Sequence, residues 1–259
     1  MRTRRTVLLV AALTGTLLAG CSKPAPKTQA PVAPSPSASA ITASGLPTLP
    51  EARQDLTAAM NRLGTTTYKF AVAGDYWDKQ KFRASGVHDP KAHRLSRTTV
   101  ISGGPDAETA KLVLMDEHQF TTTGSSGVWT HADLTAMPAN NEYRHIDAAD
   151  PIGLGRFATT LTTVRRTSPH AFQGNGFIEF RRGEIAYLPL GAPVLVGTGR
   201  GFVDFTATTD GQGRITSIRT ELKTKNGTLT DTVTFRDFGI EVTPSKPAGA
   251  RNVPASYER

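Results

Sequence analysis

Apolar side chains recur at every second position in many short runs of the chain beyond residue 64, and this pattern predicts a sheet of many strands. Clusters of Gly, Asp, Asn, Ser and Pro separate the runs. Alternation of this kind is typical of strands that bury one face and leave the other to water. The short spacing predicts an antiparallel meander. The predicted strands are 68–72, 82–84, 94–102, 112–115, 119–123, 202–209, 214–223 and 228–238.

A helix is predicted over residues 48–63, before the first strand. Thr48 and Glu51 have the spacing of a capping box, and Gly64 is a natural C-terminal stop. Because polar residues occupy the other positions, we expect the apolar stripe to pack on a sheet of the same domain. The stripe consists of Leu49, Ala52, Leu56, Ala59, Met60 and Leu63.

A second helix is predicted to begin at Asp150 and Pro151, with the aspartate as N-cap and proline in the first helical position. Gly153, Gly155 and several threonines weaken this helix. Its apolar positions lie broadly on one side, so it is expected to lie across a sheet. They are Ile152, Leu154, Phe157, Ala158, Leu161 and Val164.

The N-terminus has the features of a secretory leader. Residues 1–20 combine a cationic start, an apolar stretch and a small-residue exit, and Cys21 follows directly. The segment 18–21, Leu-Ala-Gly-Cys, resembles the bacterial lipobox. That resemblance implies a diacylglyceryl group on Cys21, which would anchor the mature protein to the cell membrane on its extracytoplasmic face. A small buried cysteine behind a cleaved leader is the alternative.

Residues 21–45 are rich in Pro, Ala, Ser and Thr and have almost no large apolar side chain. Such a stretch cannot bury enough surface to offset its ordering entropy, so it is expected to be a semi-rigid tether. Residues 46–259 remain as one substantial folded domain. Within it, 187–199 mixes apolar residues with Pro, Gly and Ala, and fits either a mobile rim or a buried strand with loop ends.

Charge and motifs argue against several functions. The chain has 30 Lys and Arg against 22 Asp and Glu, but five of the cations precede the first acid, Glu51, so the domain is nearly balanced and a nucleic-acid role is not expected. Phosphate-binding loops, a nucleophile elbow and a His-Glu-x-x-His motif are absent from the sequence. His88 and His93 lack a third ligand at a telling distance and are expected in a surface loop. We therefore expect neither enzymatic activity nor a metal or cofactor.

The order of these elements resembles the LolA/LppX-type lipoproteins, which include LprG-like proteins of actinobacteria. The resemblance covers the domain from about residue 46 and is one of layout. LolA itself is soluble and lacks a lipid anchor, so what carries over is the fold and the kind of ligand. The local features that match are Ala59–Met60, Thr65–Phe70, Trp129–Leu134, Asp150–Leu154, Asp210–Ile215 and Phe235–Gly239.

The resemblance implies an α+β fold, a strongly curved antiparallel half-barrel sheet with helices packed on its concave face. That face can enclose an apolar cavity for a lipid, lipoglycan or other amphiphile, with Arg165, Arg166, Arg181 and Arg182 as candidates to meet an anionic headgroup. The alternatives are a sensory or scaffolding module whose partner is another envelope protein, as in RseB-like proteins, and a secreted hydrolase. The candidate cavity residues, each of which also fits an ordinary core, are Leu56, Met60, Tyr68, Phe70, Val72, Phe157, Leu161, Phe180, Phe202, Ile218 and Phe235.

Overall fold

The protein is described from a computed structural model. The predicted leader, the anchor at Cys21, the tether and the capping residue Thr48 lie outside the described residues. The described residues belong to the second of two compact units, residues 42–259. They are 50–75, 79–103, 107–124, 127–138, 146–147, 149–180, 186–187, 194–195, 199–224, 227–241 and 244–253.

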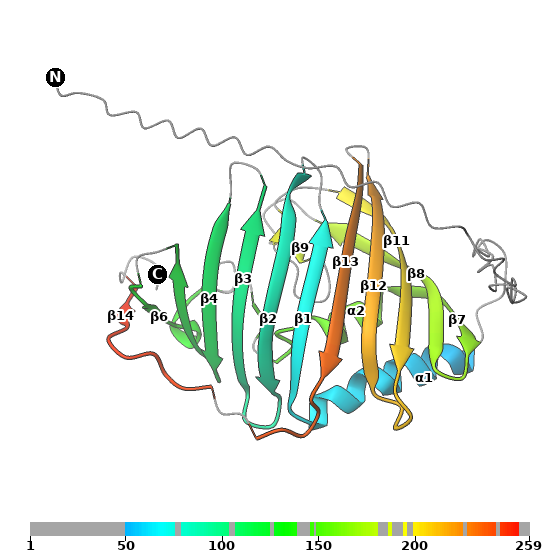
Figure 1. The fold of residues 1–259 in the computed structure, drawn as a ribbon, viewed down its shortest axis with the longest axis horizontal. Coiled ribbons are helices and arrows are strands. Elements are labelled where there is room, and N and C mark those ends of the chain that lie inside the picture. Colours follow the sequence, from blue (N-terminus) through cyan, green and yellow to red (C-terminus); the bar gives the residue numbers. More distant parts are fainter. Residues whose placement is uncertain are drawn as a thin grey trace, which may run out of the picture. The chain divides into compact units, whose positions relative to one another are not determined.

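One curved sheet of 12 strands dominates this unit (Figure 1). Its order is β14-β6-β5-β4-β3-β2-β1-β13-β12-β11-β8-β7, and its two ends do not pair, so the sheet is not closed. All neighbours are antiparallel except β14 and β6. The strands are β1 (Tyr68–Asp75), β2 (Lys81–Asp89), β3 (Arg94–Ser102), β4 (Glu108–Met115), β5 (His118–Thr123), β6 (Thr130–Asp133), β7 (Leu161–Ser168), β8 (Ala171–Phe180), β11 (Gly199–Thr209), β12 (Ile215–Thr224), β13 (Gly227–Arg236) and β14 (Arg251–Asn252).

Alternating burial gives the central strands one apolar face, as the sequence predicts. Tyr68, Phe70 and Val72 of β1 are buried, and the register sets Phe70 opposite Phe235 and Val72 opposite Val233 of β13. We call the side of the sheet that carries these residues the apolar face. A separate pair, β9 (Ala186–Tyr187) with β10 (Val194–Leu195), overlaps the segment 187–199 that is predicted as a rim or a strand.

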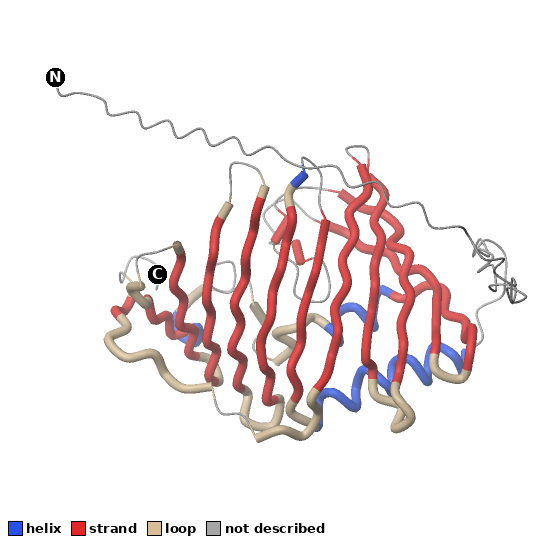
Figure 2. Tube along the Cα trace, viewed as in Figure 1, coloured by secondary structure: helices blue, strands red, loops and turns tan. Residues whose placement is uncertain are grey.

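The first predicted helix is confirmed as α1 (Pro50–Asn61), which is followed by a short 3-10 turn over Arg62–Thr65. In Figure 2 this helix and α2 (Leu154–Thr160) are the main blue segments beside the red sheet. The buried side of α1 joins the same hydrophobic cluster as the apolar face, and the helix contacts β7 and α2. None of the described helices is long and apolar enough to cross a membrane.

The second predicted helix is shorter than expected. It begins at Leu154, after Gly153 adopts a left-handed conformation with φ of 76°, and it ends at Thr160. Leu161 and Val164, predicted to lie on the helix, are buried residues of β7 instead. The threonine-rich segment explains this change, because β-branched side chains lose rotamer freedom in a helix and fit a strand well.

Strands β7 and β8 were not predicted. In β8 a glycine interrupts the alternation of apolar side chains that marks a strand. Gly174 occupies a position where apolar alternation would require a large side chain. A Cβ there would overlap the carbonyl oxygen of Thr163 and lie 3.0 Å from the ring of Phe205. The register of β7 on β8 also shifts between Leu161 and Thr163. A missing side chain and an irregular register let these strands approach closely where the sheet curves.

Candidate functional site

The structure brings most of the predicted cavity residues together on the apolar face and its helices. Phe157 of α2 meets Phe205 of β11 edge to face, with ring centroids 5.5 Å apart. Phe180 lies in β8, but its side chain is outside the described residues. Burial fixes the side of the sheet for these residues, and their contact with a ligand stays a prediction. Those buried in the one cluster are Leu56, Met60, Tyr68, Phe70, Val72, Phe157, Leu161, Ile218 and Phe235.

Phe202 does not belong to this set, so its predicted inward position is wrong. The side chain is 62% exposed and meets Phe177 of β8, also exposed, at a centroid distance of 5.3 Å. In β11 the buried positions are Val203, Phe205 and Ala207, so strand alternation turns Phe202 to the opposite face.

A buried carboxyl group interrupts the apolar face at Asp231 of β13. The residue is 1% exposed, and neither carboxyl oxygen has a hydrogen-bond partner. Its neighbours in register are Gly74 of β1 and Thr220 of β12. Burial raises the pKa of Asp231 to about 8, so at neutral pH the group is mostly protonated and has both a donor and acceptors to offer. Sequence reasoning missed Asp231, although it breaks the apolar alternation of 229–235.

Gln119 of β5 is a second buried polar side chain without a partner. It is 1% exposed, and neither its amide nitrogen nor its amide oxygen has a hydrogen bond. It lies opposite the buried Leu114 of β4. Native cores pair most of their buried polar atoms. The apolar face therefore leaves hydrogen-bonding capacity unused at two separate strands.

Tyr68 and His88 form a buried polar pair on this face, and their hydrogen bond satisfies both groups. The Tyr68 hydroxyl lies 2.9 Å from Nδ1 of His88, and the rings meet edge to face. Burial lowers the pKa of His88 to about 4 and raises that of Tyr68. The prediction that His88 lies in a surface loop is wrong, because β2 extends to Asp89 and turns His88 inward, opposite Tyr68. His93, in the turn, is exposed.

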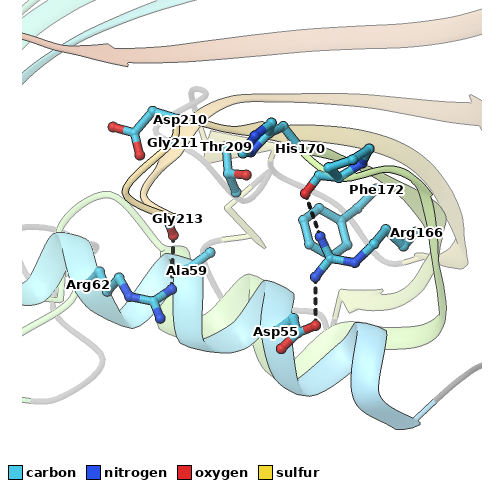
Figure 3. Close-up of a pocket in the computed structure, with 11 residues that line it drawn as sticks. Asp55, Ala59, Arg62, Arg166, His170, Phe172, Thr209, Asp210, Gly211 and Gly213 are labelled. Atoms are coloured by element: carbon cyan, nitrogen blue, oxygen red, sulfur yellow. Dashed lines mark hydrogen bonds and ion pairs between the residues drawn. The ribbon is translucent and has the colours of Figure 1, made fainter.

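A cavity of about 230 Å³ lies where α1 passes the β7–β8 and β11–β12 turns (Figure 3). Arg166 ion-pairs with Asp55 of α1 at 2.6 Å and donates to the carbonyl of Pro169, also at 2.6 Å. Arg62 donates to the carbonyl of Gly213 at 3.0 Å. The lining residues are Asp55, Ala59, Arg62, Arg166, Pro169, His170, Phe172, Thr209, Asp210, Gly211 and Gly213.

The charges around this cavity largely neutralise one another. Asp210 pairs with Arg214 at 2.7 Å and accepts backbone hydrogen bonds in its turn. Burial acts to raise the pKa of Asp210, but these contacts outweigh it and lower the pKa. Arg166 is already engaged by Asp55 and lies 4.5 Å from the ring centroid of Phe172. These contacts fasten α1 to two turns, so the cavity is better explained as an attachment point than as an anion site. A headgroup role for Arg165, Arg166, Arg181 and Arg182 stays a prediction, and Arg181 and Arg182 lie outside the described residues.

Within the described residues, no group of three or more His, Cys, Asp or Glu side chains is arranged to hold a metal ion.

No protein-family model matches the chain, and no curated protein matches it. Among solved structures, the chain is similar to an uncharacterized conserved protein from Thermus thermophilus, with 12% identity and a TM-score of 0.43 over 78% of this chain and 98% of that chain. It is also similar to a beta-barrel-like protein of domain of unknown function DUF1849 from Brucella abortus, with 8% identity and a TM-score of 0.18 over 68% and 98%. The likeness is too weak to carry a functional argument.

Proposed function

We propose that this protein is an extracytoplasmic lipoprotein, anchored to the membrane through Cys21, that binds or carries a lipid, lipoglycan or other amphiphile without chemistry of its own. The proposal includes a LolA/LppX-like half-barrel whose concave side is the apolar face, with α1 and α2 packed against it. The leader and lipobox pattern in the sequence supports the anchor. The sheet is not closed and has one apolar face, and both features support the binding function.

The unpartnered carboxyl of Asp231 on the apolar face is the observation that carries the proposal. A buried polar group without a hydrogen bond costs about 1–3 kcal/mol. A guest that brings a hydroxyl, amide or ester group to Asp231 would recover this cost, while its acyl chain gains about 0.8 kcal/mol for each methylene that it buries. An amphiphile supplies both kinds of group.

Mass spectrometry of the full chain tests the proposal. The acyl groups on Cys21 are covalent and survive denaturation, whereas a guest is released. We expect the mass under native conditions to exceed the denatured mass by that of an amphiphile, and a Cys21→Ser variant to keep this difference while losing the anchor. Equal native and denatured masses, together with failure of the emptied protein to take up a fluorescent fatty acid, would contradict the lipid-binding function.

A matched pair of variants localises the guest. Asp231→Leu keeps the branched shape of the side chain and removes the polar group, so the amount of bound amphiphile should fall. Thr232→Ala, on the other face of the same strand, should leave it unchanged. Equal loss in the two variants would show that binding does not involve the apolar face.

A second candidate function is a sensory or scaffolding module of the same fold, whose partner is another envelope protein. The exposed pair of Phe177 and Phe202 favours it, because aromatic residues that remain exposed beside one another are typical of protein contact sites. Crosslinking from position 202 in intact cells separates the two. A specific protein adduct on a chain that holds no amphiphile supports the second candidate.

A further inference from the structure

Two histidines that are well separated in the sequence meet at one end of the sheet. His118 begins β5 and His131 lies in β6, and the Nε2 atom of His131 is 3.2 Å from the Nδ1 atom of His118. The other ring nitrogen of His131, Nδ1, lies 2.9 Å from Oδ1 of Asn252 in β14. The parallel pairing of β14 with β6 sets Asn252 beside His131. Three strands thus contribute to one small cluster.

The hydrogen bond to Asn252 determines which nitrogen of His131 is free. An amide oxygen only accepts, so the Nδ1 atom of His131 carries the proton and donates it. The Nε2 atom then has a lone pair, and it points toward His118. In this state the Nδ1 atom of His118 donates a hydrogen bond to the Nε2 atom of His131. His118 can change to its other neutral tautomer, in which the Nε2 atom carries the proton. Both facing nitrogens then have lone pairs, and the charge of the protein is unchanged.

Neighbouring side chains hold the His131 ring in this orientation. Its ring stacks on the buried Phe120, with centroids 4.7 Å apart and an interplanar angle of 21°. Asp133 is directly opposite His118 in the register. Directly opposite residues of an antiparallel pair lie on the same face, so a carboxyl group lies near the two imidazoles. His118 is exposed, which leaves the facing nitrogens open to an incoming ion.

We propose that His118 and His131 form a binding site for a divalent transition-metal ion of the zinc or copper type. Two imidazole nitrogens bound to one tetrahedral zinc ion lie about 3.3 Å apart, given bond lengths of about 2.0–2.1 Å. The observed separation of 3.2 Å is close to this distance, and binding requires the rings to turn so that both lone pairs point at the ion. Imidazole suits these metals, whereas Mg²⁺ prefers oxygen ligands.

Asn252 has the role of a positioning residue at this site. Metal-binding histidines usually donate their second ring N–H to an oxygen, and loss of that partner typically weakens affinity about 10–100-fold. With two protein ligands, water fills the remaining positions, so the ion exchanges readily. Because the ion bridges β5 and β6, and Asn252 joins β14 to His131, metal binding would also stabilise this end of the sheet.

Zinc titration of the full chain tests the site, with Mg²⁺ as the control ion. The protein is prepared without an affinity tag and with Cys21→Ser, so that a free thiol does not bind zinc. We expect one zinc ion to bind by calorimetry and to shift the Nδ1 resonance of His118 and the Nε2 resonance of His131 in histidine ¹⁵N spectra. We expect Mg²⁺ to do neither.

Single substitutions decide whether these residues hold the ion. His118→Ala should abolish the zinc isotherm, and Asn252→Ala should weaken it about 10–100-fold while both imidazoles remain. His93→Asn is the matched control, because His93 is exposed, has φ of 50°, and asparagine tolerates that conformation. Unfolding curves without zinc establish that each variant is folded. Zinc binding unchanged in His118→Ala, or zinc-induced shifts confined to other histidines, would overturn the proposal.

Discussion

Replacing Asp231 with Asn should remove a loss of stability that the wild-type protein suffers as the pH rises toward 8. The carboxyl group is buried without a partner on the apolar face, and burial raises its pKa to about 8. In the unfolded chain the same group titrates near its ordinary value of 3.8. Asparagine has nearly the same shape and never ionises, so the variant isolates the contribution of this single proton.

The sign and size of the effect follow from proton linkage. Between pH 3.8 and about 8 the folded protein holds a proton on Asp231 that the unfolded chain has lost, so the free energy of unfolding falls as pH rises. His88 acts in the opposite sense, because burial lowers its pKa from 6.5 to about 4. Between these two values the unfolded chain holds a proton on His88 that the folded protein lacks, so the free energy of unfolding falls as the pH falls below 6.5. Each slope is about 1.36 kcal/mol per pH unit. The two offset each other below pH 6.5, and from pH 6.5 to 8 Asp231 alone costs about 2 kcal/mol.

Urea unfolding followed by circular dichroism measures this difference. The free energy of unfolding is obtained at several values between pH 5 and pH 8.5 for the wild type and for Asp231→Asn. Other titrating groups are common to both proteins, so the difference between the two curves reports Asp231. Because His88 is present in both proteins, the difference should grow in favour of the variant by about 1.36 kcal/mol per pH unit from pH 5 toward pH 8. Parallel curves over the whole range would refute a buried, protonated carboxyl.

Three further comparisons test the packing. Phe157→Ala should destabilise the fold by about 3–5 kcal/mol, whereas Phe202→Ala should change it by less than about 0.5, because only the first is buried; thermal unfolding of both decides this. Gly174→Ala should lower the melting temperature clearly and Gly211→Ala should not, since a Cβ at position 211 meets no atom within 4 Å; an equal effect of both would contradict the close strand approach. Tyr68→Phe should cost about 1–3 kcal/mol in urea unfolding, because a buried imidazole loses its partner.

Most strands of the sheet and the first helix could be predicted from the sequence because their signals are local. Alternating side chains define β1 and β13, and helical spacing defines α1. Strand β8 could not be found in this way, because glycines at 174 and 176 replace the apolar side chains that would mark its inner face. The second helix was extended too far because apolar spacing does not distinguish a helix from a strand over a few residues.

Fewer features of the candidate site could be predicted from the sequence, for a physical reason. Periodicity assigns a face, and it did so correctly for Tyr68 and Phe235, but an error of one position sends a side chain to the opposite face, as at Phe202. Pairings between distant strands have no local signal at all. The contact of His131 with Asn252, which are 121 positions apart, appears only when β14 pairs with β6.

The position of β1 in the middle of the sheet has a consequence for the order in which the chain folds. Its partner on one side, β2, is synthesised immediately after it, but its partner on the other side is β13. Lys69 and Asp237, which pair across that seam, are 168 positions apart. Until β13, the last long strand, has joined the sheet, β1 has an unpaired edge on which a second copy of the chain can add. The incompletely folded protein is therefore vulnerable to misassembly at β1, a strand that has a partner on both sides in the finished sheet.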